Sequence, residues 1–259
     1  AAMTLTLLAH GSPDPRHARD VASLSGRLRV AGVPSRAAYL DHNEPGAAHV
    51  ARELERSGAA STTVVPLLLA PAYHVRVDVP TAISAMRAAA PDLPVAAAEP
   101  VGLHPLVLDA AAELVQGSGL PVGPRTGLIL AGAGSRDLRA VAAVEALVTG
   151  HGPALRERLG VRSVRGAYLD GGRPLGRIRT LMRCVDGCTS FLVVTLMIAD
   201  GILRDRIVAA ASRMDLPVVP GTLADTNALA DLVVLRAGTA PAPVTAADPS
   251  TSNSARARS

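Results

Sequence analysis

The sequence predicts an α/β fold in which two similar halves each form a parallel sheet with helices on both faces. Short unbroken apolar runs alternate with helical patterns, and the same series of segments then occurs a second time. Unbroken apolar strands are typical of parallel sheets whose two faces are both covered by helices. The length of 259 residues fits two domains of about 100–150 residues each.

In the first half, each apolar run predicts a strand and each stretch between runs has helical periodicity. The predicted strands are Thr4–Ala9, Pro34–Leu40, Thr62–Ala70 and Pro94–Ala98. The predicted helices lie near 15–31, 45–57, 78–90 and 104–116. Residues 117–126 are rich in Gly and Pro, which is typical of a linker, and the pattern then restarts.

The restart is an internal repeat, because four segments recur in the same order. These pairs are LLAHGSPD (7–14) with LAGAGSRD (130–137), AAYLDHNEP (37–45) with GAYLDGGRP (166–174), VVPLLLAPAYHVRVDV (64–79) with VVTLMIADGILRDRIV (193–208), and DLPV at 92–95 and 215–218. The offset is 123 residues for the first and last pairs and 129 for the two middle pairs, which predicts one insertion near 150–160 that is compensated later in the chain. We expect lobes at 1–118 and 126–237, followed by a disordered tail at 239–259 that is rich in Ala, Pro, Ser and Thr.

Composition excludes several classes of function. All 26 basic residues are Arg, so a P-loop lysine and a pyridoxal Schiff base are excluded. One Phe, three Tyr and no Trp argue against a stacking platform for nucleic acid. The net charge of +4 is mild and many arginines stand beside acids, so we expect no nucleic-acid partner.

Cys184 and Cys188, in the spacing CxxxC, are the two cysteines. They are too few for a four-thiolate iron–sulfur cluster, a zinc site or a disulfide framework, and fit thiols of a reducing cytosol. No apolar run reaches the roughly 18 residues of a membrane span. The N-terminal apolar run lacks a basic flank and breaks at His10, so it predicts a strand and not a signal peptide. We therefore expect a cytoplasmic protein without membrane contact.

The repeat acts as an internal control, because a residue that differs between matched positions is not required by the fold. Three polar residues of the first half are replaced in the second half: His10 by Ala133, Glu44 by Arg173 and His74 by Leu203. Each of the three follows a predicted strand, and the carboxyl ends of parallel strands form the edge where α/β sheets bind ligands. If the strand order is 2-1-3-4, His10 lies between the other two.

Two imidazoles and a carboxylate at such an edge suit a first-row divalent metal and leave positions open for exchange. Each residue also has a simpler interpretation. A histidine at a strand end is often capped or solvated, and Glu44 before Pro45 could favour the start of the next helix. The loss of all three in the second half favours the metal site.

The segments AHGS (9–12), NEP (43–45) and PLLLAPAYHVRVDVP (66–80) resemble the sirohydrochlorin chelatases, the class II tetrapyrrole chelatases. The resemblance covers nearly the whole chain, repeat included. It implies two flavodoxin-like lobes facing a cleft, and insertion of Fe²⁺ or Co²⁺ into sirohydrochlorin without a nucleotide. It also implies that His10 and His74 bind the metal with the assistance of Glu44, and that one half of the long form has lost these ligands. His42 and Ala72 depart from the family pattern. The two interpretations of His42 are an extra ligand and a surface residue, and we expect a surface residue.

The implied substrate carries eight carboxylates, so its rim requires hydrogen-bond donors. Candidates are Arg16, Arg76 and the backbone amides at Gly11 and Ser12, which open the first helix. For both arginines a solvated surface position is the alternative.

We expect iron insertion in siroheme biosynthesis. The alternatives are cobalt insertion for cobalamin, or a metal or tetrapyrrole carrier without turnover. No flavin or iron–sulfur cluster is expected, and a monomer is expected because both lobes belong to one chain. His104 precedes a helix and is expected to cap it.

Overall fold

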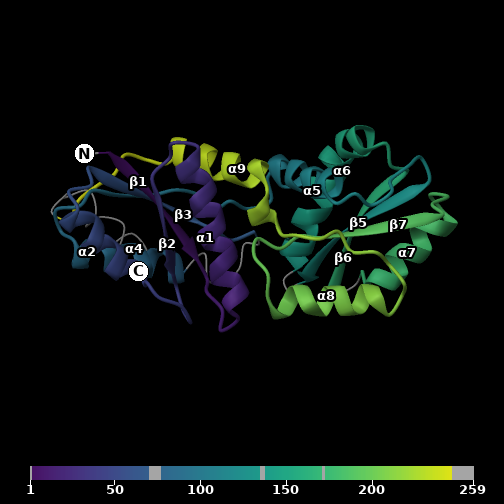
Figure 1. The fold of residues 1–259 in the computed structure, drawn as a ribbon, viewed down its shortest axis with the longest axis horizontal. Helices are drawn as coiled ribbons and strands as arrows, with labels where there is room; N and C mark the ends of the chain where they lie inside the picture. Colours follow the sequence, from purple (N-terminus) through teal and green to yellow (C-terminus); the bar gives the residue numbers. More distant parts are fainter. Residues whose placement is uncertain (1, 70–76, 135–137, 171–172, 247–259) are drawn as a thin grey trace. The chain divides into compact units, whose positions relative to one another are not determined.

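The computed structural model of the chain describes residues 2–69, 77–134, 138–170 and 173–246. The chain divides into two compact units, each built around a parallel sheet (Figure 1). The first unit contains 1–13, 21–102 and 233–259, and the second contains 14–20 and 103–232. The α/β class with two helix-flanked parallel sheets is therefore confirmed.

The first sheet has the order β2-β1-β3-β4, and all its pairings are parallel. Its strands are β1 (Met3–Ala9), β2 (Ser35–Tyr39), β3 (Ser61–Pro66) and β4 (Val95–Ala97). The apolar runs therefore predicted every strand, although β3 ends earlier than expected. The order places β1 between β2 and β3, which is the arrangement on which the predicted site depends.

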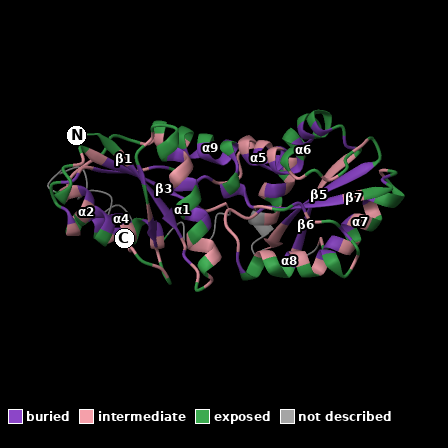
Figure 2. Cartoon of the chain, viewed as in Figure 1, coloured by how far each residue is buried: buried purple, intermediate pink, exposed green. Residues whose placement is uncertain are grey.

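Helices cover this sheet because their apolar stripes match its buried strands. The helices are α1 (Pro15–Val30), α2 (Ala47–Arg56) and α4 (Asp78–Ala89). Val50 and Leu54 of α2 and Met86 of α4 form one buried cluster with the sheet. On α1, the Ser25 hydroxyl lies 2.9 Å from that of Ser35 at the start of β2. Figure 2 shows the strands buried and the outer helix faces exposed.

The second sheet repeats the first in its pairing register. Its strands β5 (Thr126–Gly134), β6 (Ser163–Asp170) and β7 (Ser190–Thr195) have the order β6-β5-β7. Ala9 pairs with Tyr39 in the first sheet, and Gly132 pairs with Tyr168 at the matched place in the second. This agreement supports the internal repeat in three dimensions.

The helices of the second unit account for the change of offset along the repeat. They are α5 (Pro105–Gly117), α6 (Leu138–Leu159), α7 (Leu175–Cys184), α8 (Ile202–Ser212), the 3-10 helix η1 (Leu223–Asp225) and α9 (Asn227–Gly238), whose last turns belong to the first unit. Helix α6 has 22 residues where α1 has 16, which places the extra residues near the predicted insertion.

Two features differ from the simplest interpretation of the repeat. Helix α5, the last predicted helix of the first half, belongs to the second compact unit. In the tail, Val244 exchanges backbone hydrogen bonds of 2.9 and 3.2 Å with Val95 of β4, so the expected disorder from Thr239 does not hold there. Residues 247–259 lie outside the described part. The lobe boundaries 1–118 and 126–237 remain a prediction about the repeat.

Candidate active site

The site begins where β1 and β2 end side by side. His10 directly follows β1, and its carbonyl oxygen accepts a 2.9 Å hydrogen bond from the amide of Asp41, which follows β2. The His10 side chain is half-buried. The sheet therefore fixes the backbone of both loops before any side chain is considered.

Gly11 makes the close approach of these loops possible. Its φ is +95°, and a Cβ built on it would lie 1.8 Å from the carbonyl oxygen of Asp41. No other residue type fits that space, and the left-handed conformation itself favours glycine. The Gly of the AHGS segment is thus required for the shape of the loop that presents His10.

Asn43 joins the first sequence segment to the second. Its Oδ1 accepts a 2.7 Å hydrogen bond from the backbone amide of Ser12. Asn43 was not among the predicted site residues, although it stands inside the NEP segment. This bond uses the Ser12 amide, which therefore does not serve the substrate in this conformation as predicted.

Glu44 lies at the same edge and has one structural role. Its Oε2 accepts a 2.8 Å hydrogen bond from the amide of Gly46, the residue that precedes α2. The helix-start interpretation of Glu44 therefore holds for one carboxylate oxygen. Within the described ranges the other oxygen, Oε1, has no hydrogen-bond partner, so Glu44 can serve the helix and still present an oxygen to a ligand.

His42 lies near His10, although the sequence predicted only a surface position. Its side chain is exposed, and its ring centroid is 6.4 Å from that of His10. The residue has a φ of +62°, and its Nε2 lies 3.6 Å from Asp41 Oδ2. His42 is thus both exposed and close to the predicted ligand.

His74 and Arg76 lie outside the described residues, as does Ala72. In the parts of the chain that the structure describes, no three His, Cys, Asp or Glu side chains are grouped so that they could hold a metal. The ligand set of His10, Glu44 and His74 is therefore a proposal.

His10 and Glu44 line the same cavity of about 620 Å³ in the first unit. Residues from both α2 and α4 complete its walls, among them His49, Arg52 and Asp78. The cavity thus extends from the carboxyl ends of the strands along two helices. It brings together two of the three residues that the sequence comparison selected.

The matched place in the second unit is small and apolar. Tyr168 and Leu169, the counterparts of two residues that line the first cavity, border a space of only about 140 Å³. Leu175, Ile207 and Met214 also line that space. An open, polar cavity in one half and a narrow, apolar one in the other agree with the loss of the polar residues.

The residues at the matched positions are also unsuited to a metal. Arg173, the counterpart of Glu44, forms an ion pair with Glu145. Leu203, the counterpart of His74, is an exposed apolar residue of α8. A cation in place of a carboxylate disfavours a bound metal ion.

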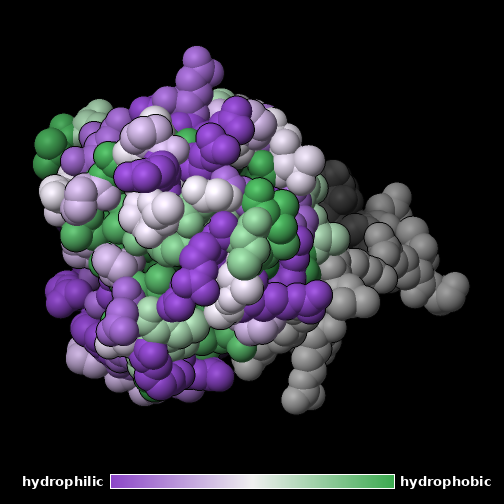
Figure 3. Space-filling model, turned by 90° about the vertical axis from the view of Figure 1, so that its right-hand side faces the viewer, coloured by the Kyte–Doolittle hydropathy of each residue, from purple (hydrophilic) through white to green (hydrophobic). Residues whose placement is uncertain are grey.

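Figure 3 shows hydrophilic and hydrophobic residues interspersed on one face of the second unit.

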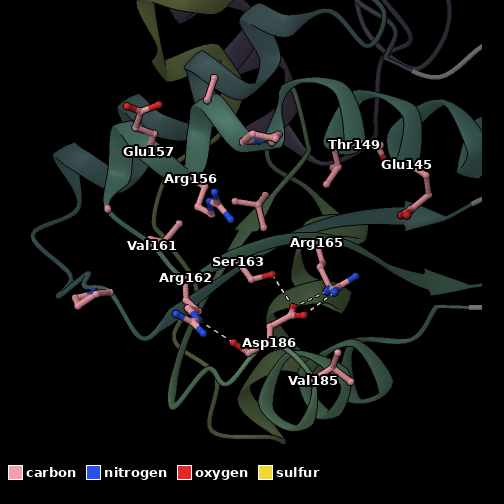
Figure 4. A pocket seen from close by; sticks show the side chains of 17 residues that line it. Glu145, Thr149, Arg156, Glu157, Val161, Arg162, Ser163, Arg165, Val185 and Asp186 are labelled. Atoms are coloured by element: carbon pink, nitrogen blue, oxygen red, sulfur yellow. Dashed lines mark hydrogen bonds and ion pairs between the residues drawn. The ribbon is translucent and has the colours of Figure 1, made fainter.

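A larger cavity of about 1190 Å³ lies at the amino ends of the strands in the second unit (Figure 4). Asp186 accepts hydrogen bonds of 2.6 and 2.7 Å from Arg165, and Arg162 donates to the Asp186 carbonyl oxygen at 2.9 Å. The Arg165 guanidinium is the main reason that the pKa of Asp186 is lowered. These arginines therefore serve internal contacts, and ligands of α/β sheets bind at the opposite edge.

Arg16, a predicted donor to the substrate, is engaged by two carboxylates of the chain itself. Its guanidinium binds Asp14 at 2.6 Å and Asp205 at 2.6 Å. The side-chain hydrogen bond from Arg16 is the main cause that lowers the pKa of Asp14 to about 2 and also lowers that of Asp205. Two carboxylates thus balance this charge, and we do not retain Arg16 as a substrate-binding residue.

We expect this ion-pair cluster to make the protein sensitive to acid. The pKa of Asp14 is lower in the folded chain than its usual value of about 4, so Asp14 contributes stability above that pH. The contribution is lost as pH falls from about 4 toward 2. The difference in melting temperature between the wild type and Asp14→Asn should therefore shrink over this range. Asp231→Asn, at an exposed position, is the control; an equal shrinkage for both variants would contradict the assignment.

Two minor predictions have structural answers. The predicted cap is confirmed, since His104 Nδ1 accepts a 3.2 Å hydrogen bond from the amide of Leu106 at the start of α5. Cys184 and Cys188 are free thiols. Burial raises the pKa of Cys188, which disfavours reactivity of that thiol.

Known proteins are similar to this chain both in sequence and in fold. The CbiX family model matches residues 4–118. The sirohydrochlorin ferrochelatase of Bacillus subtilis (strain 168) is 27% identical over 203 residues, which cover 77% of this chain and 76% of that protein. The chain is therefore similar to the sirohydrochlorin chelatases in sequence. The family match lies in the half that carries His10, Glu44 and the cavity of about 620 Å³ that they line.

Solved structures share the fold of this chain over most of its length. SirB from Bacillus subtilis with Fe³⁺ has a TM-score of 0.72 at 22% identity, covering 91% of this chain and 94% of that chain. SirB from Bacillus subtilis subspecies spizizenii in complex with cobalt has a TM-score of 0.66 at 17% identity, covering 92% and 94%. Within the described ranges, no helix of the chain has the length and apolar character needed to cross a membrane.

Proposed function

We propose that this protein inserts a divalent metal, with Fe²⁺ as the first candidate, into sirohydrochlorin. The observation that carries the proposal is the cavity shared by His10 and Glu44 at the carboxyl ends of β1 and β2. Its counterpart in the second unit is narrow and apolar. The iron- and cobalt-containing structures of SirB and the ferrochelatase relative support a metal as the substrate that is inserted.

The proposed residues can carry the chemistry of the reaction. One M²⁺ enters the macrocycle, four nitrogens bind it, and two pyrrole-type N–H groups each release a proton. We assign metal binding to His10 and His74, because neutral imidazole binds first-row metals and leaves open positions for exchange. Glu44, with one oxygen available, assists as a ligand or receives a proton. The amide of Gly11 and the Arg76 side chain remain candidates for binding substrate carboxylates.

The proposal extends to the conditions in which the protein works. We propose that insertion needs no nucleotide, flavin or iron–sulfur cluster, and that the protein acts as a cytoplasmic monomer in which the second half supplies no metal ligand. The presence of both parallel sheets in one chain supports the monomer.

The direct test is insertion by the purified protein. Sirohydrochlorin is mixed with Fe²⁺ or Co²⁺ without oxygen, metallation is followed by absorbance, and the spontaneous rate is subtracted. We expect a protein-dependent rate that needs no added nucleotide, and the ratio of the two rates identifies the preferred metal. A rate equal to the spontaneous one, with binding retained, would favour a carrier and contradict the proposal.

A further inference from the structure

Arg52 is a cationic side chain in the wall of the cavity that holds His10 and Glu44. It lies on α2, is exposed, and lines the cavity. Of the described residues that line this space, Arg52 carries the only permanent positive charge. Asp41, Glu44 and Asp78 line the same space. The cavity wall is therefore acidic apart from this one arginine and its histidines.

The acids nearest Arg52 along α2 are already engaged by other groups. Glu53 lies 3.3 Å from the Nε2 of His49 and 3.5 Å from the guanidinium of Arg36. Glu55 accepts a 2.9 Å hydrogen bond from the backbone amide of Asp92. Arg52 itself forms no ion pair with any part of the chain that the structure describes. Its charge therefore remains available to a ligand, in contrast to that of Arg16.

A substrate with eight carboxylates meets an electrostatic problem at this cavity. Acidic residues suit the incoming metal ion but repel the rim of the macrocycle, so a cation beside them is required for both substrates to bind. Arginine is suited to this task because its planar guanidinium binds a carboxylate through two parallel hydrogen bonds.

We propose that Arg52 binds a peripheral carboxylate of sirohydrochlorin and thereby selects polycarboxylate macrocycles. This inference rests on the proposed function, since it concerns the same cavity. It replaces Arg16, the donor that the sequence suggested, by a residue whose charge is not already balanced. The metal ligands are separate groups, so Arg52 contributes to binding of the macrocycle and not to binding of the metal.

The test compares substitutions at two arginines of the same helix. Arg52→Gln removes the charge in the cavity wall, and Arg56→Gln removes an equal charge from the last turn of α2, outside the lining of the cavity. Binding of metal-free sirohydrochlorin is measured by absorbance titration. We expect Arg52→Gln to raise Kd about fivefold, as for the loss of one partly exposed ion pair, and Arg56→Gln to change it less than twofold.

Three further readouts sharpen the test. Arg52→Lys should restore part of the affinity, Arg52→Gln should make binding less dependent on salt, and Co²⁺ binding should be unchanged in Arg52→Gln. Equal effects of Arg52→Gln and Arg56→Gln, or no effect of either, would overturn the inference. If the wild type inserts no metal but Arg52→Gln still weakens macrocycle binding, the proposed function fails and Arg52 keeps its role in carboxylate binding.

Discussion

Replacing His10 by alanine is expected to lower metal insertion by at least about 100-fold, the lower range for losing a group that binds a reactant or moves a proton. His10 stands at the end of β1 and lines the cavity with Glu44, so its replacement removes the proposed ligand without opening the core. His74→Ala should have an effect of the same size. Insertion into sirohydrochlorin is followed by absorbance, with circular dichroism to verify the fold.

His42 provides a matched control for this experiment. It is a second imidazole near His10, but it is exposed and has a φ of +62°. Asparagine tolerates that backbone conformation, so His42→Asn tests the imidazole without straining the loop. We expect activity within about threefold of the wild type. A loss as large as that of His10→Ala would make His42 a ligand and contradict its assignment to the surface.

Gly11→Ala is expected to destabilise the protein by about 2–4 kcal/mol and to abolish most insertion. The added Cβ would lie 1.8 Å from the Asp41 carbonyl oxygen, so one of the two loops must move, and His10 moves with the first of them. The free energy of unfolding is measured by urea denaturation, and the insertion rate is measured on the folded fraction.

Gly58→Ala separates the cost of the left-handed backbone conformation from the cost of the close contact with Asp41. Gly58 also has a positive φ, +71°, but a Cβ there would meet nothing within 4 Å. This control should cost about 1 kcal/mol, the penalty of the left-handed conformation alone, and should leave insertion unchanged. If Gly11→Ala were no worse than Gly58→Ala, the close contact with Asp41 would not be important for the site.

The strands were predictable because their signal is local. Buried parallel strands are continuous apolar runs, and those of β1 and β2 stand out in the sequence. The matched segments then predicted a second sheet, and the register at Tyr39 and Tyr168 agrees with that prediction. The membership of α5 in the second unit could not be predicted, because it depends on packing between segments that are far apart in sequence.

The candidate site was predictable in part, because the two halves of the repeat could be compared. His10 and Glu44 were found because the second half lacks them, and the structure places both at one cavity. The ion pair of Arg16 with Asp205 could not be predicted, because the two residues lie 189 positions apart in sequence. Asn43 and Arg52 were missed because hydrogen-bond partners and the charge balance of a cavity wall become visible only in three dimensions.

The position of a bound metal ion shows which half of the chain holds the metal site. Crystals soaked in Co²⁺ and measured at the cobalt absorption edge reveal the ion by its anomalous scattering. We predict one strong peak within bonding distance of the His10 imidazole, about 2.0–2.2 Å from nitrogen as for first-row metals, with His74 as the second ligand and Glu44 adjacent. A peak at the strand ends of the second half, near Ala133 and Arg173, with none at His10, would contradict the account.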